Sequence, residues 1–249
     1  MAPDPRSTRP AARRRVWQAG VVGCLLVFVP HYAMSADEAA FERARQQMVE
    51  RQLKARDITD ARVLRAMARV PRHRFVSPAL GPQAYTDRAL PIEEGQTISQ
   101  PYIVALMTQL LELSGSERVL EVGTGSGYQA AVLADLGAEV YTIEILPGLA
   151  SSAAERLKGL GYTRVAVRAG DGYQGWPEAA PFAAIAVTAG ATHIPEPLVA
   201  QLAEGGRLVI PVGASSGTQE LIQGRKTGGR LVTRVVIPVR FVPLVEPRR

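Results

Sequence analysis

The sequence predicts an α/β fold in which a mainly parallel sheet carries helices on both of its faces. From residue 118 onward, short apolar runs alternate with amphipathic helical patterns, as parallel strands and their crossover helices do. The first apolar run leads into a turn with Gly123, Gly125 and Gly127, and glycines at such a turn let the backbone approach a nucleotide ligand. The expected fold is therefore Rossmann-like, with a helical extension before the sheet and antiparallel strands after it.

The region before the sheet is expected to be mainly helical. Apolar residues recur at helical spacing between residues 38 and 70, which predicts two helices, with Thr59 or Asp60 as the N-cap of the second. Residues 72–98 mix proline, glycine and polar residues, so we expect an irregular loop that faces the substrate. A third amphipathic helix is predicted over residues 100–113.

Strands and helices then alternate towards the end of the chain. The expected strands cover residues 118–122, 139–145, 164–169, 182–187 and 207–212. The expected helices cover residues 128–136, 147–160 and 196–203. Residues 220–223 and 231–242 flank a Lys-Thr-Gly-Gly turn and predict an antiparallel ending. We expect one domain over residues 37–249, with a helical substrate-side region (37–115) and a Rossmann-like core (116–249).

The distribution of charge argues against a nucleic-acid partner. The formal net charge is +6, but residues 1–15 alone hold five arginines against one aspartate, a net +4. Residues 37–249 hold 24 basic and 22 acidic residues, a net of only +2. Ten of these basic residues lie between residues 41 and 74. This cluster indicates a solvated helix face, with a surface that attracts an acidic protein substrate as the alternative.

Cysteine and histidine are too scarce to suggest a metal site. Cys24 is the single cysteine, and His31, His73 and His193 lie far apart in the sequence. Neither residue type shows the spacing of a zinc site. We expect chemistry that needs no metal, in a domain without disulfides.

Acidic residues at three predicted strand ends define a candidate ligand site. Glu121 lies two residues before the first glycine of the turn, Glu144 ends the second strand, and Asp171 ends the third, followed by Gly172. A carboxylate at position 121 would repel a pyrophosphate but suits a ligand with an ammonium group. The carboxylate at 144 suits ribose hydroxyls, and the carboxylate at 171 suits an adenine amino group. This pattern favours a methyltransferase that binds S-adenosylmethionine over a dehydrogenase.

Ser99 stands directly before the predicted third helix and has two compatible interpretations. As an N-cap, it would accept a hydrogen bond from the backbone, with Pro101 in the first turn. As a site residue, its hydroxyl would donate to a carboxylate held at the positive end of the helix. Spacing alone favours the N-cap.

The chain resembles the protein-L-isoaspartate O-methyltransferases from about residue 48 to residue 242. The similar blocks cover residues 48–53, 70–76, 89–92, 95–102 and 120–129, and Gly95-Gln-Thr-Ile-Ser-Gln-Pro-Tyr102 is the most specific. The resemblance implies that Ser99 is the active-site residue. It also implies substrate contacts by Thr97, Ser99 and Gln219, the last from a loop that closes over the substrate. Thr188 is a further candidate, because it follows a core strand where α/β sheets bind ligands.

The same resemblance implies cofactor contacts by the residues named above: Glu121, Gly123, Gly125, Gly127, Glu144, Asp171 and Gly172. It further implies that a methyl group moves from S-adenosylmethionine to the free α-carboxylate of L-isoaspartyl and D-aspartyl residues in damaged proteins. The ester would then close to a succinimide and allow repair, and we expect a monomer. The alternatives are a methyltransferase of the same fold acting on a small-molecule acid or nucleic acid, and an exported binding protein without activity.

Residues 1–36 have the organisation of a targeting segment. Three arginines at 13–15 precede an apolar run over 16–29 and the small-residue site Ala33-Met-Ser-Ala36, which is the order of a secretory signal. The run is short for a membrane span. Because S-adenosylmethionine is made and kept inside cells, we expect a cytoplasmic protein. The alternatives are export, anchoring through residues 13–36, or a translation start at Met34 or Met48.

Overall fold

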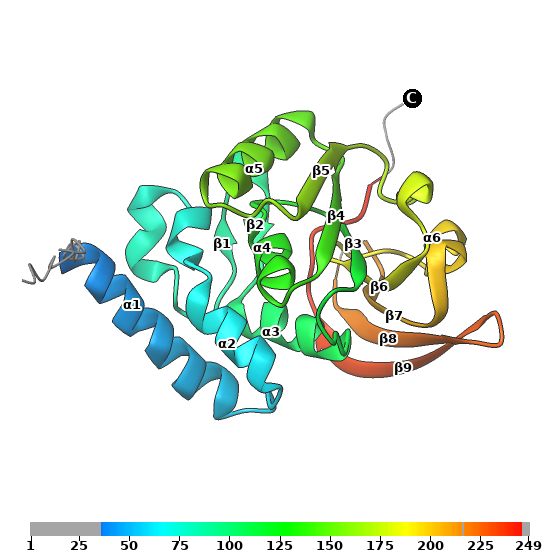
Figure 1. The fold of residues 1–249 in the computed structure, drawn as a ribbon, viewed down its shortest axis with the longest axis horizontal. Helices are drawn as coiled ribbons and strands as arrows, with labels where there is room; N and C mark the ends of the chain where they lie inside the picture. The colour runs from blue at the N-terminus through cyan, green and yellow to red at the C-terminus, as the bar shows by residue number, and fades with distance from the viewer. Residues whose placement is uncertain (1–35, 216, 246–249) are drawn as a thin grey trace, which may run out of the picture. The chain divides into compact units, whose positions relative to one another are not determined.

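A seven-stranded sheet organises the part of the chain that the computed structural model describes, residues 36–215 and 217–245 (Figure 1). The strand order is β5-β4-β3-β6-β7-β8-β9. Five neighbouring strands are parallel: β5 (Val165–Ala169), β4 (Glu139–Glu144), β3 (Arg118–Val122), β6 (Phe182–Val187) and β7 (Leu202–Gly213). β8 (Gln219–Thr227) and β9 (Arg230–Val239) extend the sheet in antiparallel pairing, and β9 forms one edge. The predicted parallel sheet with an antiparallel ending is confirmed.

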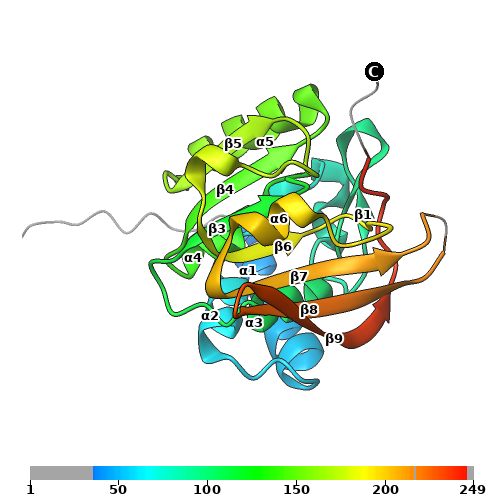
Figure 2. The same ribbon diagram turned by 90° about the vertical axis from the view of Figure 1, so that its right-hand side faces the viewer.

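Helices cover both faces of this sheet. α3 (Pro101–Leu110), α4 (Tyr128–Asp135) and α5 (Pro147–Gly159) contribute to a core that contains Val119 of β3. On the other face, α6 (Glu196–Gln201) buries Leu198 in a second core, which contains Leu120. Figure 2 shows α6 in front of the sheet, beside β7. Neighbouring residues of β3 thus enter different cores, as expected for a strand that is buried on both faces.

The N-terminal part of the described chain is helical, as predicted. α1 (Ala36–Met48) continues into the π-helical turn η1 (Val49–Lys54), and α2 (Ala61–Arg69) follows. Of the two N-cap candidates, Asp60 caps α2, because its Oδ1 accepts a hydrogen bond from Arg62 N at 2.8 Å. The expectation for residues 1–36 as a leader lies outside the described residues, except for Ala36.

The predicted loop over residues 72–98 contains only short elements. These are the 3₁₀ turns η2 (Arg72–Phe75), η3 (Pro78–Gln83) and η4 (Glu93–Gly95), and the paired strands β1 (Leu90–Pro91) and β2 (Thr97–Ile98). A further turn, η5 (Pro177–Ala179), follows β5. β1 and β2 place the most specific block of the sequence directly before α3.

Four predicted boundaries were wrong by three residues or more, and one of them is the end of β8, at Thr227 instead of residue 223. α3 ends at Leu110 instead of residue 113, and Glu112 takes a positive φ of 49° two residues later. β7 starts five residues earlier than expected, because Leu202 already pairs with Phe182 of β6. β9 ends at Val239 instead of residue 242. The last change matters for the site, because it frees residues 240–245 from the sheet.

The basic cluster at residues 41–74 is less solvated than expected. Arg45 and Arg72 are buried, and each donates to a backbone carbonyl oxygen. Arg56 and Arg69 pair with carboxylates from outside the cluster, at 2.9 and 2.5 Å. Much of this positive charge therefore holds the helical segment together.

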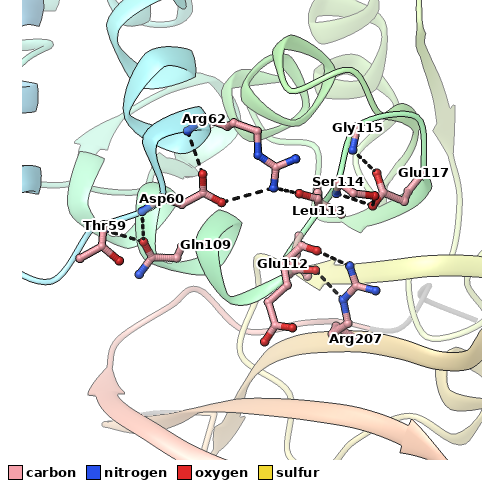
Figure 3. Close-up of polar contacts among 11 residues, drawn as sticks. Thr59, Asp60, Arg62, Gln109, Glu112, Leu113, Ser114, Gly115, Glu117 and Arg207 are labelled. Carbon is pink, nitrogen blue, oxygen red and sulfur yellow. Dashed lines mark hydrogen bonds and ion pairs between the residues drawn. The ribbon is translucent and has the colours of Figure 1, made fainter.

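Polar contacts tie the helical segment to the sheet around the end of α3 (Figure 3). Gln109 accepts hydrogen bonds from the backbone N–H groups of Thr59 (2.7 Å) and Asp60 (2.8 Å). Arg62 donates to the carbonyl oxygen of Leu113. From the sheet side, Arg207 of β7 donates to the carbonyl oxygens that follow α3. The described residues from Ala36 onward accordingly belong to one compact unit.

Glu117 stabilises the turn between α3 and β3 in a pH-dependent way. Partial burial raises the pKa of Glu117, but hydrogen bonds from Ser114 and Gly115 outweigh this effect and hold the pKa at about 2. A depressed pKa stabilises the fold above the unfolded-state value of 4.5, and this contribution is lost as the pH falls towards 2. We expect Glu117→Gln to lower the free energy of unfolding at pH 7, and to lower it less at pH 3. Denaturant titrations at both pH values measure this, and an equal loss at both would contradict it.

Candidate active site

A pocket of about 400 Å³ opens at the carboxyl ends of β3, β4 and β6. This edge of a parallel sheet is where α/β proteins bind ligands. Glu121, Gly123, Gly125, Glu144 and Gly172 all line the pocket, so the structure brings most of the predicted cofactor residues together. We call it the cofactor pocket.

The glycine turn after β3 approaches the end of β6 too closely for a side chain at Gly123. A Cβ atom there would lie 2.5 Å from Thr188 Oγ1, and Gly123 also has a φ of +100°. The Thr188 hydroxyl donates to the carbonyl oxygen of Gly123 at 2.6 Å. Gly127 does not line the pocket, and its missing side chain leaves room for Leu157 of α5. Contact between Gly127 and the cofactor stays a prediction.

Glu121 presents an unsatisfied carboxylate oxygen in the wall of the cofactor pocket. The residue is fully buried, and its Oε2 accepts a hydrogen bond from Thr142 Oγ1 at 2.6 Å. Its Oε1 has no partner among the described residues. Burial, together with the nearby charge of Glu144, raises the pKa of Glu121 to about 8. A buried acceptor without a partner fits a ligand that brings its own positively charged donor.

Glu144 links the end of β4 to the glycine turn. Its Oε2 accepts from Gly125 N at 2.9 Å, and its Oε1 accepts from Leu146 N at 3.2 Å. These bonds fix the carboxylate in the pocket wall. An ionised carboxylate has about four acceptor sites, so Glu144 can still accept hydrogen bonds from two ribose hydroxyls.

Of the Asp171-Gly172 pair, only Gly172 lines the pocket. A Cβ atom at Gly172 would lie 2.5 Å from Val122 Cγ1, so the backbone here needs glycine to approach β3. Asp171 Oδ1 accepts from Tyr173 N at 2.9 Å and thereby closes its own turn. Contact between Asp171 and an adenine amino group stays a prediction.

A second pocket, of about 340 Å³, adjoins the cofactor pocket. The two pockets share four lining residues: Thr97, Ser99, Thr188 and Val242. Three of these four were predicted from the sequence as substrate contacts. We call the second cavity the acceptor pocket.

The predicted N-cap role of Ser99 was wrong. The cap residue of α3 is Gln100, and no side chain of the cap bonds to the helix. Asp87 performs this task from the preceding loop, because its Oδ1 accepts from Tyr102 N at 3.1 Å. Ser99 makes no hydrogen bond within the described residues, and its half-buried side chain lines both pockets. Its hydroxyl is therefore available to a ligand.

The predicted substrate contact of Gln219 is not supported by its position. Gln219 is 1% exposed and lines neither pocket. Its side chain accepts from Phe241 N at 2.8 Å and donates to Phe241 O at 3.3 Å. Side chains alternate along β8, so residue 219 points into the core while its neighbour Thr218 lines the acceptor pocket. Gln219 positions the segment around Phe241.

That segment also supplies a wall of the cofactor pocket that the sequence analysis missed. Val242, Pro243, Leu244 and Val245 line the pocket. Gly190 holds them in place, since its N–H donates to Val242 O and its carbonyl oxygen accepts from Leu244 N, both at 2.8 Å. No pattern within residues 242–245 could have identified this wall, because the contacts that hold it come from Gly190, more than fifty residues earlier.

The described part of the chain contains neither a candidate metal site nor a candidate membrane-spanning helix. No group of three or more His, Cys, Asp or Glu side chains there could hold a metal ion. No helix there is long and apolar enough to cross a membrane.

Fold and site together define the class of protein. A glycine turn lies between two acids at the carboxyl ends of a parallel sheet, and one buried carboxylate oxygen in the pocket wall lacks a partner. This arrangement is that of a class I methyltransferase with S-adenosylmethionine as its cofactor. The family described as "Protein-L-isoaspartate(D-aspartate) O-methyltransferase (PCMT)" matches residues 43–249, and the chain belongs to this family.

Individual relatives agree with this assignment. The protein-L-isoaspartate O-methyltransferase of Opitutus terrae is 58% identical over 214 residues, which cover 84% of this chain and 92% of that protein. A Plasmodium falciparum protein named as a protein-L-isoaspartate O-methyltransferase, crystallised with S-adenosyl-L-homocysteine, is 29% identical with a TM-score of 0.70; the match covers 81% of this chain and 98% of that one. A further solved protein-L-isoaspartate O-methyltransferase is 31% identical with a TM-score of 0.73; the match covers 80% of this chain and 65% of that one.

Proposed function

We propose that this enzyme transfers a methyl group from S-adenosylmethionine to the free α-carboxylate of L-isoaspartyl residues, and to the free β-carboxylate of D-aspartyl residues, in damaged proteins. The observation that carries the proposal is the wall shared by the two pockets. Ser99, Thr97 and Thr188 stand between a pocket suited to the cofactor and a pocket of a size that suits part of a peptide. Family membership over residues 43–249 supports the same activity.

In the proposed site, the protein binds and orients both partners. Glu121 accepts from the ammonium group of the cofactor, and Glu144 accepts from its ribose hydroxyls. Ser99 donates to one oxygen of the substrate carboxylate, and the other oxygen faces the cofactor pocket. The apolar side chains of Val242 and Leu244 limit the access of water to this junction.

The reaction needs no general base in this site. When bound, S-adenosylmethionine would supply a methyl group on a positively charged sulfur, and transfer to the carboxylate oxygen would release the neutral thioether S-adenosylhomocysteine. An ionised carboxylate is already nucleophilic, so catalysis rests on alignment and partial desolvation of the two opposite charges. The methyl ester that results then closes to a succinimide without the enzyme, as the following backbone nitrogen displaces methanol. Hydrolysis of the succinimide returns part of the residues to normal aspartate and the rest to isoaspartate, which can be methylated again.

Methyl transfer from labelled S-adenosylmethionine to an isoaspartyl peptide tests the proposal, with the matched aspartyl peptide as control. We expect label in the isoaspartyl peptide alone. Equal labelling of both peptides would contradict recognition of the isoaspartyl residue. Labelling of neither peptide, with the cofactor still bound, would refute the substrate and favour a small-molecule acid.

We also propose that the enzyme acts as a monomer in the cytoplasm, without a nucleic-acid partner. The reason for the location is chemical, because S-adenosylmethionine is made and kept inside cells. The near-neutral charge of residues 37–249 supports the absence of a nucleic-acid partner. Fractionation of cells that produce the full chain should recover it with the soluble cytoplasmic proteins, and recovery from the exported or membrane fraction would contradict this location.

A further inference from the structure

We propose that Arg240 makes this enzyme prefer isoaspartyl substrates with a second carboxylate, on an acidic residue that flanks the isoaspartyl residue. The inference rests on the proposed function, because it concerns the peptide that occupies the acceptor pocket.

Arg240 is the one charged residue that lines the acceptor pocket in the described part of the chain. The rest of the lining consists of neutral polar side chains, such as Gln100 and Thr218, and of apolar ones, such as Ile103. Arg240 is exposed and forms no ion pair or hydrogen bond within residues 36–215 and 217–245. Its positive charge is therefore available to a bound peptide.

The backbone on either side of Arg240 is anchored. On one side, Val239 pairs with Gln219 in the β8–β9 register. On the other side, the Gln219 side chain binds both the N–H and the carbonyl oxygen of Phe241. The guanidinium thus extends from a fixed point at the pocket, and less conformational freedom is lost when it binds a partner.

Glu220, an acid on the same face of the β8–β9 pair, leaves Arg240 free. Glu220 pairs with Pro238 in the β8–β9 register, and continuing the register places Thr218 across from Arg240. Residues that lie opposite each other in antiparallel strands share a face. Glu220 does not line the acceptor pocket, and no ion pair joins it to Arg240 within the described residues.

The partner of Arg240 is a different carboxylate from the one that is methylated. Arg240 lines only the acceptor pocket, whereas Ser99 lies on the wall shared with the cofactor pocket. An arginine paired with the reacting carboxylate would hold its negative charge, which disappears during methyl transfer, far more strongly than the neutral Ser99 hydroxyl does, and this would slow the reaction. A carboxylate on a neighbouring residue keeps its charge throughout, so its ion pair strengthens binding without opposing the chemistry.

The test compares three isoaspartyl peptides with the full-length protein. The first peptide has glutamate beside the isoaspartyl residue and an amidated C-terminus. The second has glutamine in place of that glutamate and is also amidated. The third has the same glutamine and a free C-terminal carboxylate. We expect kcat/KM to be about two- to fivefold higher for the glutamate peptide than for the amidated glutamine peptide, as for an exposed ion pair. The difference should lie in KM, and it should shrink as salt is added.

Variants of β9 and the segment after it assign the preference to Arg240. Arg240→Gln should remove the preference for the glutamate peptide, and Arg240→Lys should retain part of it. Arg230→Gln is the matched control, because it removes the same charge from an exposed position about 30 Å further along the strand. The preference should survive in this control.

Three outcomes would overturn the proposal, and a fourth concerns the activity itself. Equal kcat/KM for the two amidated peptides would refute the preference. Loss of the preference in Arg230→Gln would show that the preference comes from the overall charge of the protein and not from Arg240. A preference for the peptide with a free C-terminus, equal to that for the glutamate peptide, would assign Arg240 to a terminal carboxylate. Failure of every isoaspartyl peptide to accept a methyl group would instead refute the proposed function.

Discussion

Replacing Ser99 by alanine is expected to lower kcat for methyl transfer about 10- to 100-fold, because the variant loses one hydrogen bond to the charged substrate carboxylate. The hydroxyl lines both pockets and has no partner within the described residues. Because it does not cap α3, its removal should leave the melting temperature and the Kd for S-adenosylmethionine close to their original values. Steady-state kinetics, thermal unfolding and calorimetry on the same variant measure all three.

Asp60→Ala is the matched control for this experiment. Asp60 is a true N-cap, of α2, and losing it should lower the free energy of unfolding by about 1 kcal/mol. Its position in the cap of α2 is outside both pockets, so kcat should be preserved. The two variants should therefore show opposite patterns of activity and stability. Full activity of Ser99→Ala with reduced stability would restore the capping role that spacing alone favoured.

Replacing Glu121 by glutamine is expected to weaken cofactor binding by about 30-fold or more, because it removes one partner of a buried charge pair. Glutamine has nearly the same shape, so the change isolates the charge. Calorimetric titration of S-adenosylmethionine into both proteins measures the difference in Kd. An unchanged Kd would exclude Glu121 from binding the ammonium group.

The same variant should change how stability depends on pH. Burial, assisted by the charge of Glu144, raises the pKa of Glu121 to about 8 in the folded protein, against 4.5 for an ordinary glutamate. A raised pKa means that stability is fully present below pH 4.5 and is lost as the pH rises to about 8. The stability of the cofactor-free protein relative to Glu121→Gln should therefore fall across this range. A constant difference from pH 4.5 to pH 8 would show that Glu121 is ionised throughout.

Local patterns were sufficient to predict the sheet and most of the cofactor pocket. The apolar run of β3, the glycines after it and Glu121 are neighbours in sequence, and Glu144 ends the next strand along the chain. The parallel topology brings these two strand ends together. These features depend on the order of residues within single strands and turns. They could be predicted because no distant contact decides them.

The acceptor side depended on distant contacts, and here the prediction failed in part. The cap of α3 comes from Asp87, which lies outside the predicted helix, so the spacing around Ser99 could not reveal it. The burial of Gln219 follows from the β8–β9 register, which a shift of one residue would reverse. Val242 and Leu244 reach the cofactor pocket because Gly190 binds this segment from more than fifty residues away.

The free edge of the sheet bears on the solubility of the protein. β9 exposes an unpaired side together with Val232 (64% exposed) and Val235 (54% exposed), and such a strand can pair with the edges of other chains. Arg230 and Arg234 place positive charge along it, and Pro238 removes one hydrogen-bond donor near its end. These three residues oppose edge-to-edge aggregation. Replacing the two arginines with valine would leave Thr233 as the one polar residue of β9 and would open this edge to aggregation.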